Sequence, residues 1–143
     1  MNLIKQILFI LVIALVSQVA WAGKVVVIVN EANNQVISTN DIKGIYSDNI
    51  IQWADGTDIK SYDLPVKDGS RESFSKKVLG TSARDAAKTW ANRKITNTAK
   101  NPPKTKKEKL VVLSVKKKKN AIGYVSEEAI AGKTGIKVVL TID

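Results

Sequence analysis

The sequence predicts an α/β fold in which a small mixed β-sheet is flanked by helices, because strand-like and helix-like segments alternate along the chain. Residues 24–29 form an almost continuous run of β-branched residues, as expected of a strand that is covered on both faces. Residues 136–142 place apolar side chains at every second position, which predicts a strand with one apolar face. Over residues 83–90, apolar side chains recur at intervals of three and four residues, which predicts an amphipathic helix.

The first 22 residues are typical of a cleavable signal peptide. Lys5 precedes an apolar run over residues 7–16, and residues 20–22 read Ala-Trp-Ala, the small-x-small pattern of a cleavage site. The apolar run is shorter than the roughly 20 residues that a membrane-spanning helix needs, which favours a signal peptide over an anchor. We therefore expect cleavage after Ala22, a periplasmic location in a bacterium, and one domain over residues 23–143 that does not span the membrane.

The composition argues against several classes of function. The chain has no cysteine, which excludes disulfides and thiol chemistry, and no histidine, the commonest general base and metal ligand. Its aspartates are spread through loops without the paired spacing that acid–base catalysis requires. We therefore expect a protein that is not an enzyme and that holds neither a metal nor another cofactor.

The chain is strongly basic, with 23 lysines and arginines against 13 aspartates and glutamates. Removal of the first 22 residues takes away only Lys5, so 22 basic residues would still exceed the 13 acidic ones by nine. Lysines cluster at residues 104–109 and 116–119, and such clusters attract anions. No aromatic residues lie among them for base stacking, so we expect no nucleic-acid binding. Anionic lipid head groups or an acidic partner protein would match these clusters better, although a solvated basic face is the plainer interpretation.

Capping and turn signals predict the first elements between the two terminal strands. Ser38 or Thr39 would start a short helix that ends near Tyr46. A strand is expected over residues 59–64, closed by Pro65.

The second half of the chain gives signals of unequal strength. Ser82 and Asp85 resemble a capping box that would begin the helix over residues 83–90. Residues 106–119 fit either a strand or a short surface helix, because an apolar centre is flanked by lysines, and the sequence leaves both open. Residues 121–125 predict a strand in which a glycine allows close approach of another element.

Three aromatic residues each have a structural and a functional interpretation. Trp53, beside a turn sequence, is expected to anchor a long loop rather than to line a cleft. Trp90 lies on the apolar face of its helix and is expected in the core. Tyr124 is expected to be a half-buried strand residue, and presentation of its hydroxyl to a ligand is the alternative.

Residues 67–74, with the sequence KDGSRESF, predict a helix start that could hold an anion. Backbone N–H groups at a helix start lack intrahelical partners and carry a partial positive charge. We expect Ser70 at the cap, with Arg71 and Lys67 adding cationic groups that suit phosphate or carboxylate. The candidate anion-binding residues are therefore Lys67, Gly69, Ser70 and Arg71. The alternative is an ordinary capped helix that binds no ligand.

A series of short segments resembles a known family. The matching segments are residues 25–30, 44–46, 53–56, 59, 70–74, 78–80, 90, 102–103 and 121–125. Their order and spacing resemble the small, single-lobe relatives of the substrate-binding proteins of phosphate ABC transporters. The resemblance covers residues 24–125 and implies a single lobe of a type II periplasmic-binding-protein-like fold.

The resemblance also implies a function. In full-length members of this family, two lobes close over phosphate, and a helix start rich in serine, glycine and threonine supplies contacts together with arginine. Ser70 and Arg71 match such positions, Phe74 would pack behind them, and Lys67 lies where family members often carry another arginine. The intervening glycine and threonine are missing here, and so is the second lobe. The resemblance thus implies an exported, substrate-binding-like protein that holds phosphate or a similar anion weakly, with a transporter permease or another envelope protein as partner.

A second function is compatible with the same scaffold. The chain could be an interaction module without a transport role, in which the basic face docks on a partner protein or an anionic membrane surface.

Overall fold

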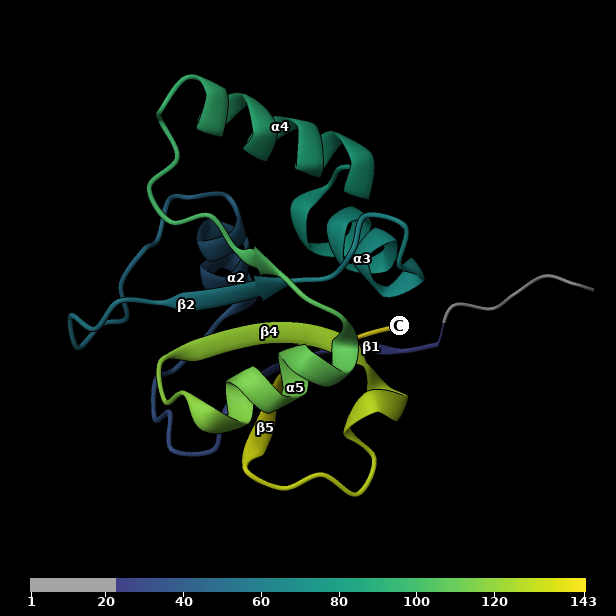
Figure 1. Ribbon diagram of the computed structural model, residues 1–143. Helices are drawn as coiled ribbons and strands as arrows, with labels where there is room; N and C mark the ends of the chain where they lie inside the picture. Colours follow the sequence, from purple (N-terminus) through teal and green to yellow (C-terminus); the bar gives the residue numbers. More distant parts are fainter. Residues whose placement is uncertain (1–22) are drawn as a thin grey trace, which may run out of the picture.

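A mixed sheet of five strands forms the centre of the computed structural model, which describes residues 23–143 (Figure 1). The strands follow the order β3-β2-β4-β1-β5. β1 is antiparallel to both β4 and β5, whereas β2 is parallel to β3 and β4, so the predicted mixed sheet is confirmed. The strands are β1 (Val25–Asn30), β2 (Lys60–Asp63), β3 (Lys104–Thr105), β4 (Ala121–Ser126) and β5 (Ile136–Ile142). The predicted signal peptide lies outside the described residues.

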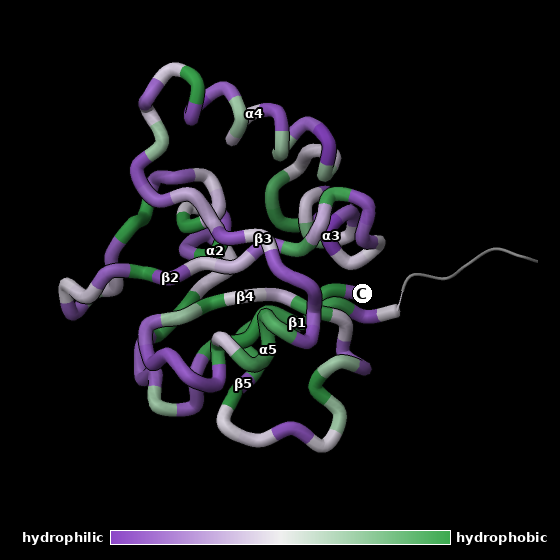
Figure 2. The backbone as a smooth tube through the Cα atoms, viewed as in Figure 1, coloured by the Kyte–Doolittle hydropathy of each residue, from purple (hydrophilic) through white to green (hydrophobic). Residues whose placement is uncertain are grey.

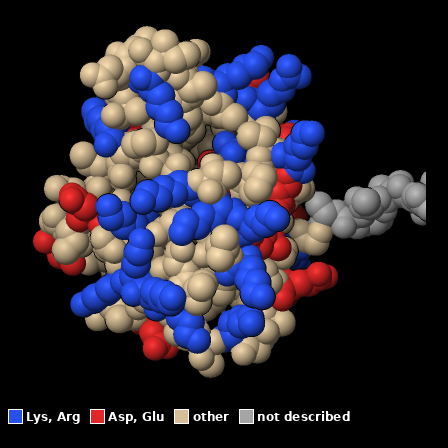
Figure 3. Space-filling model, in the orientation of Figure 1, with Lys and Arg blue, Asp and Glu red and all other residues tan. Residues whose placement is uncertain are grey.

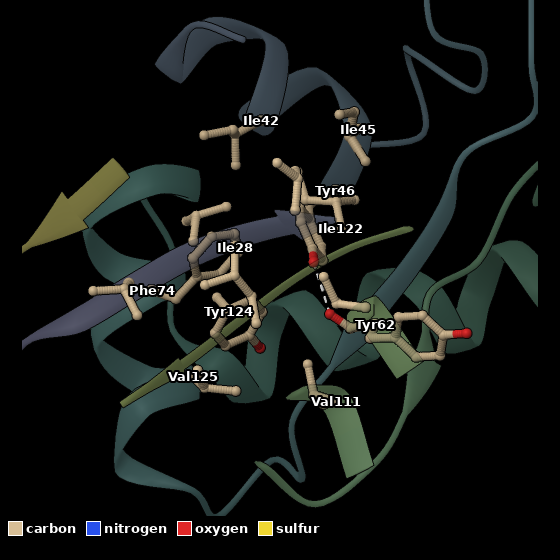
Figure 4. Close-up of a cluster of buried hydrophobic side chains, with 14 of the residues drawn as sticks. Ile28, Ile42, Ile45, Tyr46, Tyr62, Phe74, Val111, Ile122, Tyr124 and Val125 are labelled. Carbon is tan, nitrogen blue, oxygen red and sulfur yellow. Dashed lines mark hydrogen bonds between the residues drawn. The ribbon is translucent and has the colours of Figure 1, made fainter. Parts of the chain in front are cut away.

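Helices cover both faces of this sheet. Tyr124 of β4 packs against aromatic rings of α2 and α3, while the preceding residue, Gly123, lies against Val111 of α5. Successive strand residues point to opposite faces, so α2 and α3 cover one face and α5 covers the other. Figure 4 shows Ile42 and Ile45 of α2 on one side of the strands and Val111 on the other.

The helices are α2 (Thr39–Tyr46), α3 (Gly69–Phe74), the π-helical turn η1 (Ser75–Leu79), α4 (Ala83–Ile95), α5 (Glu108–Lys117) and the 3₁₀ turn η2 (Glu127–Ile130). No helix in residues 23–143 is long and apolar enough to cross a bilayer.

The core lies between the sheet and the inner faces of these helices. Every residue of β1 is buried, which confirms the prediction of a strand covered on both sides. Figure 2 shows hydrophobic residues along β1 and in the neighbouring part of α5, whereas most of α4 is hydrophilic. Tyr46, Phe74 and Tyr124 form an aromatic cluster in which the Phe74 and Tyr124 rings are stacked 3.9 Å apart (Figure 4). The Tyr46 hydroxyl donates a hydrogen bond of 2.7 Å to the carbonyl oxygen of Tyr62, which links α2 to β2.

The predicted caps of α2 and α4 are confirmed. The Ser38 hydroxyl accepts the Asp41 N–H, and the Asp41 carboxylate accepts the Ser38 N–H at 2.8 Å. The Ser82 hydroxyl accepts the Asp85 N–H at 3.1 Å. Both contacts satisfy backbone donors that a helix start would otherwise leave unpaired.

Residues 106–119, which the sequence left open, contain helix α5 rather than a strand. Val111, Val112 and Val115 are buried against the sheet, and this spacing places them on one side of a helix. Leu110 and Leu113 are exposed on the other side.

The prediction of one regular apolar face on β5 is wrong at its centre. Val27 pairs with Leu140 but Ile28 pairs with Val138, so Val139 is an extra residue in a β-bulge. Val138 is consequently 43% exposed, whereas Val139 and Leu140 both pack in part against the core. The bulge shifts the alternation of buried and exposed positions by one residue.

Gly123→Ala is expected to destabilise the protein by about 1–3 kcal/mol, because there is no room for a larger residue. An added Cβ would lie 2.5 Å from Cγ1 of Val111, so α5 would have to move away from β4. Urea unfolding followed by circular dichroism measures the loss. Gly69→Ala is the control, since nothing lies within 4 Å of the corresponding Cβ position. Equal losses for the two variants would contradict the close packing of α5 on β4.

Candidate functional site

The start of α3 lies at the edge of the sheet where the parallel strands β2 and β4 end. β2 leads into α3 and β3 leads into α5, so two helices begin near this edge. Contacts among Ser70, Glu108 and Ser126 join the starts of α3 and α5 to the end of β4. In α/β proteins, ligands commonly bind outside the carboxyl ends of parallel strands. This edge is therefore the candidate site, and it includes the residues that the sequence selected.

Asp68, rather than Ser70, caps α3. The Asp68 carboxylate accepts the Ser70 N–H at 2.8 Å, and the helix begins at Gly69. The expectation of a serine hydroxyl at the cap is wrong, because the helix begins before Ser70, where the Asp68 carboxylate accepts a backbone N–H and is also favoured by the helix dipole. The Ser70 hydroxyl is left free to contact another group.

The Arg71 guanidinium points into the protein. Arg71 is only 4% exposed; its Nη2 lies 3.2 Å from Oδ2 of Asp63, and its Nη1 donates a hydrogen bond of 2.8 Å to the carbonyl oxygen of Leu64. Arg71 thus connects α3 to the end of β2, beneath the surface on which the other candidate residues lie.

Asp63 is the centre of a buried polar network that the sequence analysis did not identify. Besides Arg71, its carboxylate accepts hydrogen bonds from the Tyr124 hydroxyl and from the Leu64 N–H. Burial raises the pKa of Asp63, and the Arg71 charge and the two hydrogen bonds act against that rise. Burial and the neighbouring Asp63 charge raise the pKa of Tyr124, so its hydroxyl stays protonated and acts as a donor. Tyr124 is fully buried and its hydroxyl is directed to Asp63, so it is not presented to a ligand at the surface.

Glu108 places a carboxylate at the start of α3. Its Oε1 accepts the Ser126 N–H at 2.6 Å and lies 3.5 Å from the Ser70 hydroxyl, while Oε2 accepts the Ser126 hydroxyl at 3.1 Å. Glu108 therefore occupies donors that an external anion would use. The only sequence signal for this residue is that it is the single acidic position between Lys104 and Asn120.

Three of the four residues that the sequence proposed as anion ligands lie at or near the surface. Lys67 and Gly69 are exposed, and Ser70 is half-buried. The fourth, Arg71, lies below them in its pair with Asp63. The structure thus brings the four residues into one turn of the chain but gives Arg71 an internal partner.

The predicted core position of Trp90 is confirmed, whereas Trp53 anchors its loop as predicted but also lines a cavity. Trp53 is buried, and its indole N–H donates a hydrogen bond of 3.0 Å to the Asn120 carbonyl oxygen, which anchors the loop; the residue also lines a cavity of about 320 Å³. Trp90 is buried, with the Arg93 guanidinium 5.1 Å from the ring centroid.

Among residues 23–143, no group of three or more histidine, cysteine, aspartate or glutamate side chains could hold a metal ion.

Two solved structures share this fold. An ABC-type phosphate transport receptor from Vibrio cholerae has 17% sequence identity and a TM-score of 0.60, and the match covers 80% of this chain and 44% of that protein. A structure with bound phosphate, of a protein assigned as a phosphate ABC transporter substrate-binding protein from Clostridium perfringens, has 18% identity and a TM-score of 0.63. That match covers 82% of this chain and 45% of the other. The chain spans less than half the length of either protein, and the predicted α/β single-lobe fold is confirmed.

The sequence also matches a known protein family over most of its length. A family model described as the PBP superfamily domain matches residues 12–139, which is most of the chain. No curated protein matches the sequence.

Arg71→Met is expected to destabilise the protein by about 3–5 kcal/mol, because it leaves the buried Asp63 carboxylate without its cationic partner. Urea unfolding measures the loss, and Lys67→Met, at an exposed neighbouring position, is the control. Adding Asp63→Asn to Arg71→Met should recover part of the stability, since no buried charge then remains at the pair. An Arg71→Met protein as stable as the unmodified one would show that the ion pair does not support the fold.

Proposed function

Because the chain belongs to the PBP superfamily domain family, we propose that it is an exported, single-lobe relative of the substrate-binding proteins of phosphate ABC transporters. In this proposal it binds phosphate or a similar anion weakly and performs no catalysis. The observation that carries the proposal is the position of the α3 start, at the carboxyl ends of β2 and β4. A transporter permease or another envelope protein is the proposed partner.

The proposed ligand contacts are the surface groups of residues 67–70. Of the first N–H groups of α3, that of Ser70 donates to the Asp68 carboxylate and that of Glu72 donates to the Asp68 carbonyl oxygen, so the Gly69 N–H is left for a ligand. An anion would therefore meet the Gly69 N–H and the Lys67 ammonium group, and it would compete with Glu108 for the Ser70 hydroxyl. Arg71 would act as a positioning residue, since its pair with Asp63 fixes the direction in which α3 leaves the sheet.

Weak binding follows from the surroundings of these groups. A single lobe leaves the bound anion in contact with water on one side, where charges are screened. The carboxylates of Asp68 and Glu108 are bonded to groups at the same helix start and would repel an anion. We therefore propose a millimolar affinity rather than the tight binding that enclosure between two lobes allows.

Phosphate in the millimolar range is expected to raise the melting temperature, because a ligand that binds only the folded state stabilises it. Thermal-shift titration with sodium phosphate, compared with sodium chloride at equal ionic strength, measures the effect. Ser70→Ala and Lys67→Ala should each weaken the response. Lys77→Ala removes the same charge at the far end of the helical segment and should leave the response intact. If phosphate and chloride change the melting temperature equally, the proposal that this site binds phosphate is refuted.

Glu108→Gln is expected to increase the affinity for phosphate by about 3- to 10-fold, or about 0.7–1.4 kcal/mol. The substitution removes the charge that opposes the ligand, while the amide oxygen can still accept from Ser126. Isothermal titration calorimetry measures the change. Glu127→Gln, an exposed charge next to the same strand end, is the matched control. An equal gain in both variants would indicate a general effect of net charge rather than a contact at the site.

The exported protein is expected to begin at Gly23, because residues 20–22 have the pattern of a cleavage site. Intact-mass measurement of protein recovered from the periplasm tests this. Ala22→Arg should block processing by removing the small residue before the cut. Recovery of the full-length chain in the cytoplasm alone would contradict the export proposal.

A further inference from the structure

The outward side of α5 combines exposed leucines with exposed lysines. Lys109, Leu110, Leu113, Lys116 and Lys117 are the exposed residues of this helix, and we name them the α5 outer face. Leu110 is 48% exposed and Leu113 is 43% exposed, although both are apolar. We propose that the α5 outer face docks on the anionic surface of a lipid bilayer, with the two leucines entering the boundary between head groups and acyl chains.

The spacing of the leucines supports a contact along the side of the helix. Leu110 and Leu113 are three residues apart, so their side chains are neighbours on the helix surface. The opposite side of α5 already packs on β4 through Val111 and Val115, and it holds the helix flat against the sheet. A helix that lies in a membrane interface needs this arrangement, with apolar side chains between basic ones.

The charge around the leucines matches an anionic bilayer. Figure 3 shows lysines and arginines gathered over this side of the molecule. Lys104, Lys107 and Lys119 are exposed beyond the two ends of α5 and extend the basic area. None of the lysines between residues 104 and 119 forms a salt bridge within residues 23–143, so their ammonium groups have no carboxylate partner in direct contact there. Basic residues close to anionic lipid are attracted to the negative surface potential.

Two further lysines are fixed in place at the rim of this area. The Lys118 ammonium group donates a hydrogen bond of 3.0 Å to the Tyr62 hydroxyl, and that of Lys106 lies 3.2 Å from the Ser114 hydroxyl. Both ammonium groups also lie over the Tyr62 ring, at 5.3 Å for Lys106 and 5.7 Å for Lys118. These contacts hold part of the positive charge in a defined position before any partner binds, which lowers the entropy lost on docking.

A bilayer fits this surface better than a nucleic acid or an acidic protein. The α5 outer face has no aromatic side chain on which bases could stack. It is a convex helix surface, and the cavity of about 320 Å³ lies beside Trp53 and Lys119 rather than along the exposed side of α5. Exposed leucines between lysines suit a bilayer, in which anionic head groups lie above an apolar layer.

Vesicle co-sedimentation of the exported chain tests the proposal. Vesicles made of equal parts phosphatidylglycerol and phosphatidylcholine should bind the protein, whereas phosphatidylcholine alone should not. Leu110→Ala with Leu113→Ala should lower the partition coefficient at least fivefold, and replacing Lys109, Lys116 and Lys117 by glutamine should lower it at least tenfold. Added salt should weaken binding of the unmodified chain more than that of the lysine variant.

Matched controls separate this surface from general effects of charge and hydrophobicity. Val36→Ala with Ile95→Ala removes two other exposed apolar side chains, and replacing Lys43, Lys77 and Lys88 by glutamine removes three other exposed charges. Both controls should bind vesicles as the unmodified protein does. Thermal unfolding confirms that each variant is folded.

Three results would overturn the proposal. One is vesicle binding that the leucine variant retains in full, since charge alone would then account for it. Another is an equal loss of vesicle binding in the α5 lysine variant and in the control variant at Lys43, Lys77 and Lys88. The third is binding to polyglutamate but not to anionic vesicles, which would assign the face to an acidic protein. The phosphate response at Ser70 should persist in all these variants, so failure of membrane docking is distinguishable from failure of anion binding.

Discussion

The buried ion pair between Asp63 and Arg71 joins three elements that are separate in the sequence. Asp63 ends β2, Arg71 lies in the first turn of α3, and Tyr124 of β4 donates its hydroxyl to the same carboxylate. A buried charge is tolerated only when it is paired and hydrogen-bonded, so these elements must meet in one arrangement. That arrangement sets the direction of α3, and it brings Phe74, three residues after Arg71, against the Tyr124 ring. The aromatic cluster of the core therefore depends on the same polar contact.

The ion pair also limits the chemistry at the edge of the sheet. The Arg71 guanidinium is directed into the protein, with Nη2 paired to Asp63 and Nη1 bonded to the Leu64 carbonyl, while its buried Nε–H has no partner in the described residues. At the surface of this edge, the charged groups near the start of α3 are the ammonium group of Lys67 and the carboxylates of Asp68 and Glu108. Residues 104–119, in and around α5, carry eight lysines against one glutamate, and this side of the molecule is strongly basic (Figure 3). The net charge of the chain is thus a poor guide to the potential at the start of α3, because potentials are set by the nearest groups.

Local patterns in the sequence predicted much of the fold, because strand periodicity and helix caps depend on residues that are close together. β1, β2, α2, α4 and β4 follow such signals. The sequence did not decide between helix and strand for α5, whose lysine-flanked apolar core suits both. It also missed the bulge in β5, because a bulge arises from the pairing with β1. The contacts that define the site span long separations, 61 residues for Asp63 with Tyr124 and 38 for Ser70 with Glu108. Arg71 has the predicted affinity for a carboxylate, but that carboxylate belongs to the protein.

The position of β1 in the sheet governs the order of folding. β1 comes first among the described strands, yet both of its hydrogen-bonded neighbours, β4 and β5, come from residues 121–142. The central pairing cannot form until those later strands have been synthesised, and such non-local contacts form slowly. During synthesis the chain therefore lacks the partners that would close its core. For a protein proposed to leave the cytoplasm, late pairing of the central strand would favour passage across the membrane before the sheet forms.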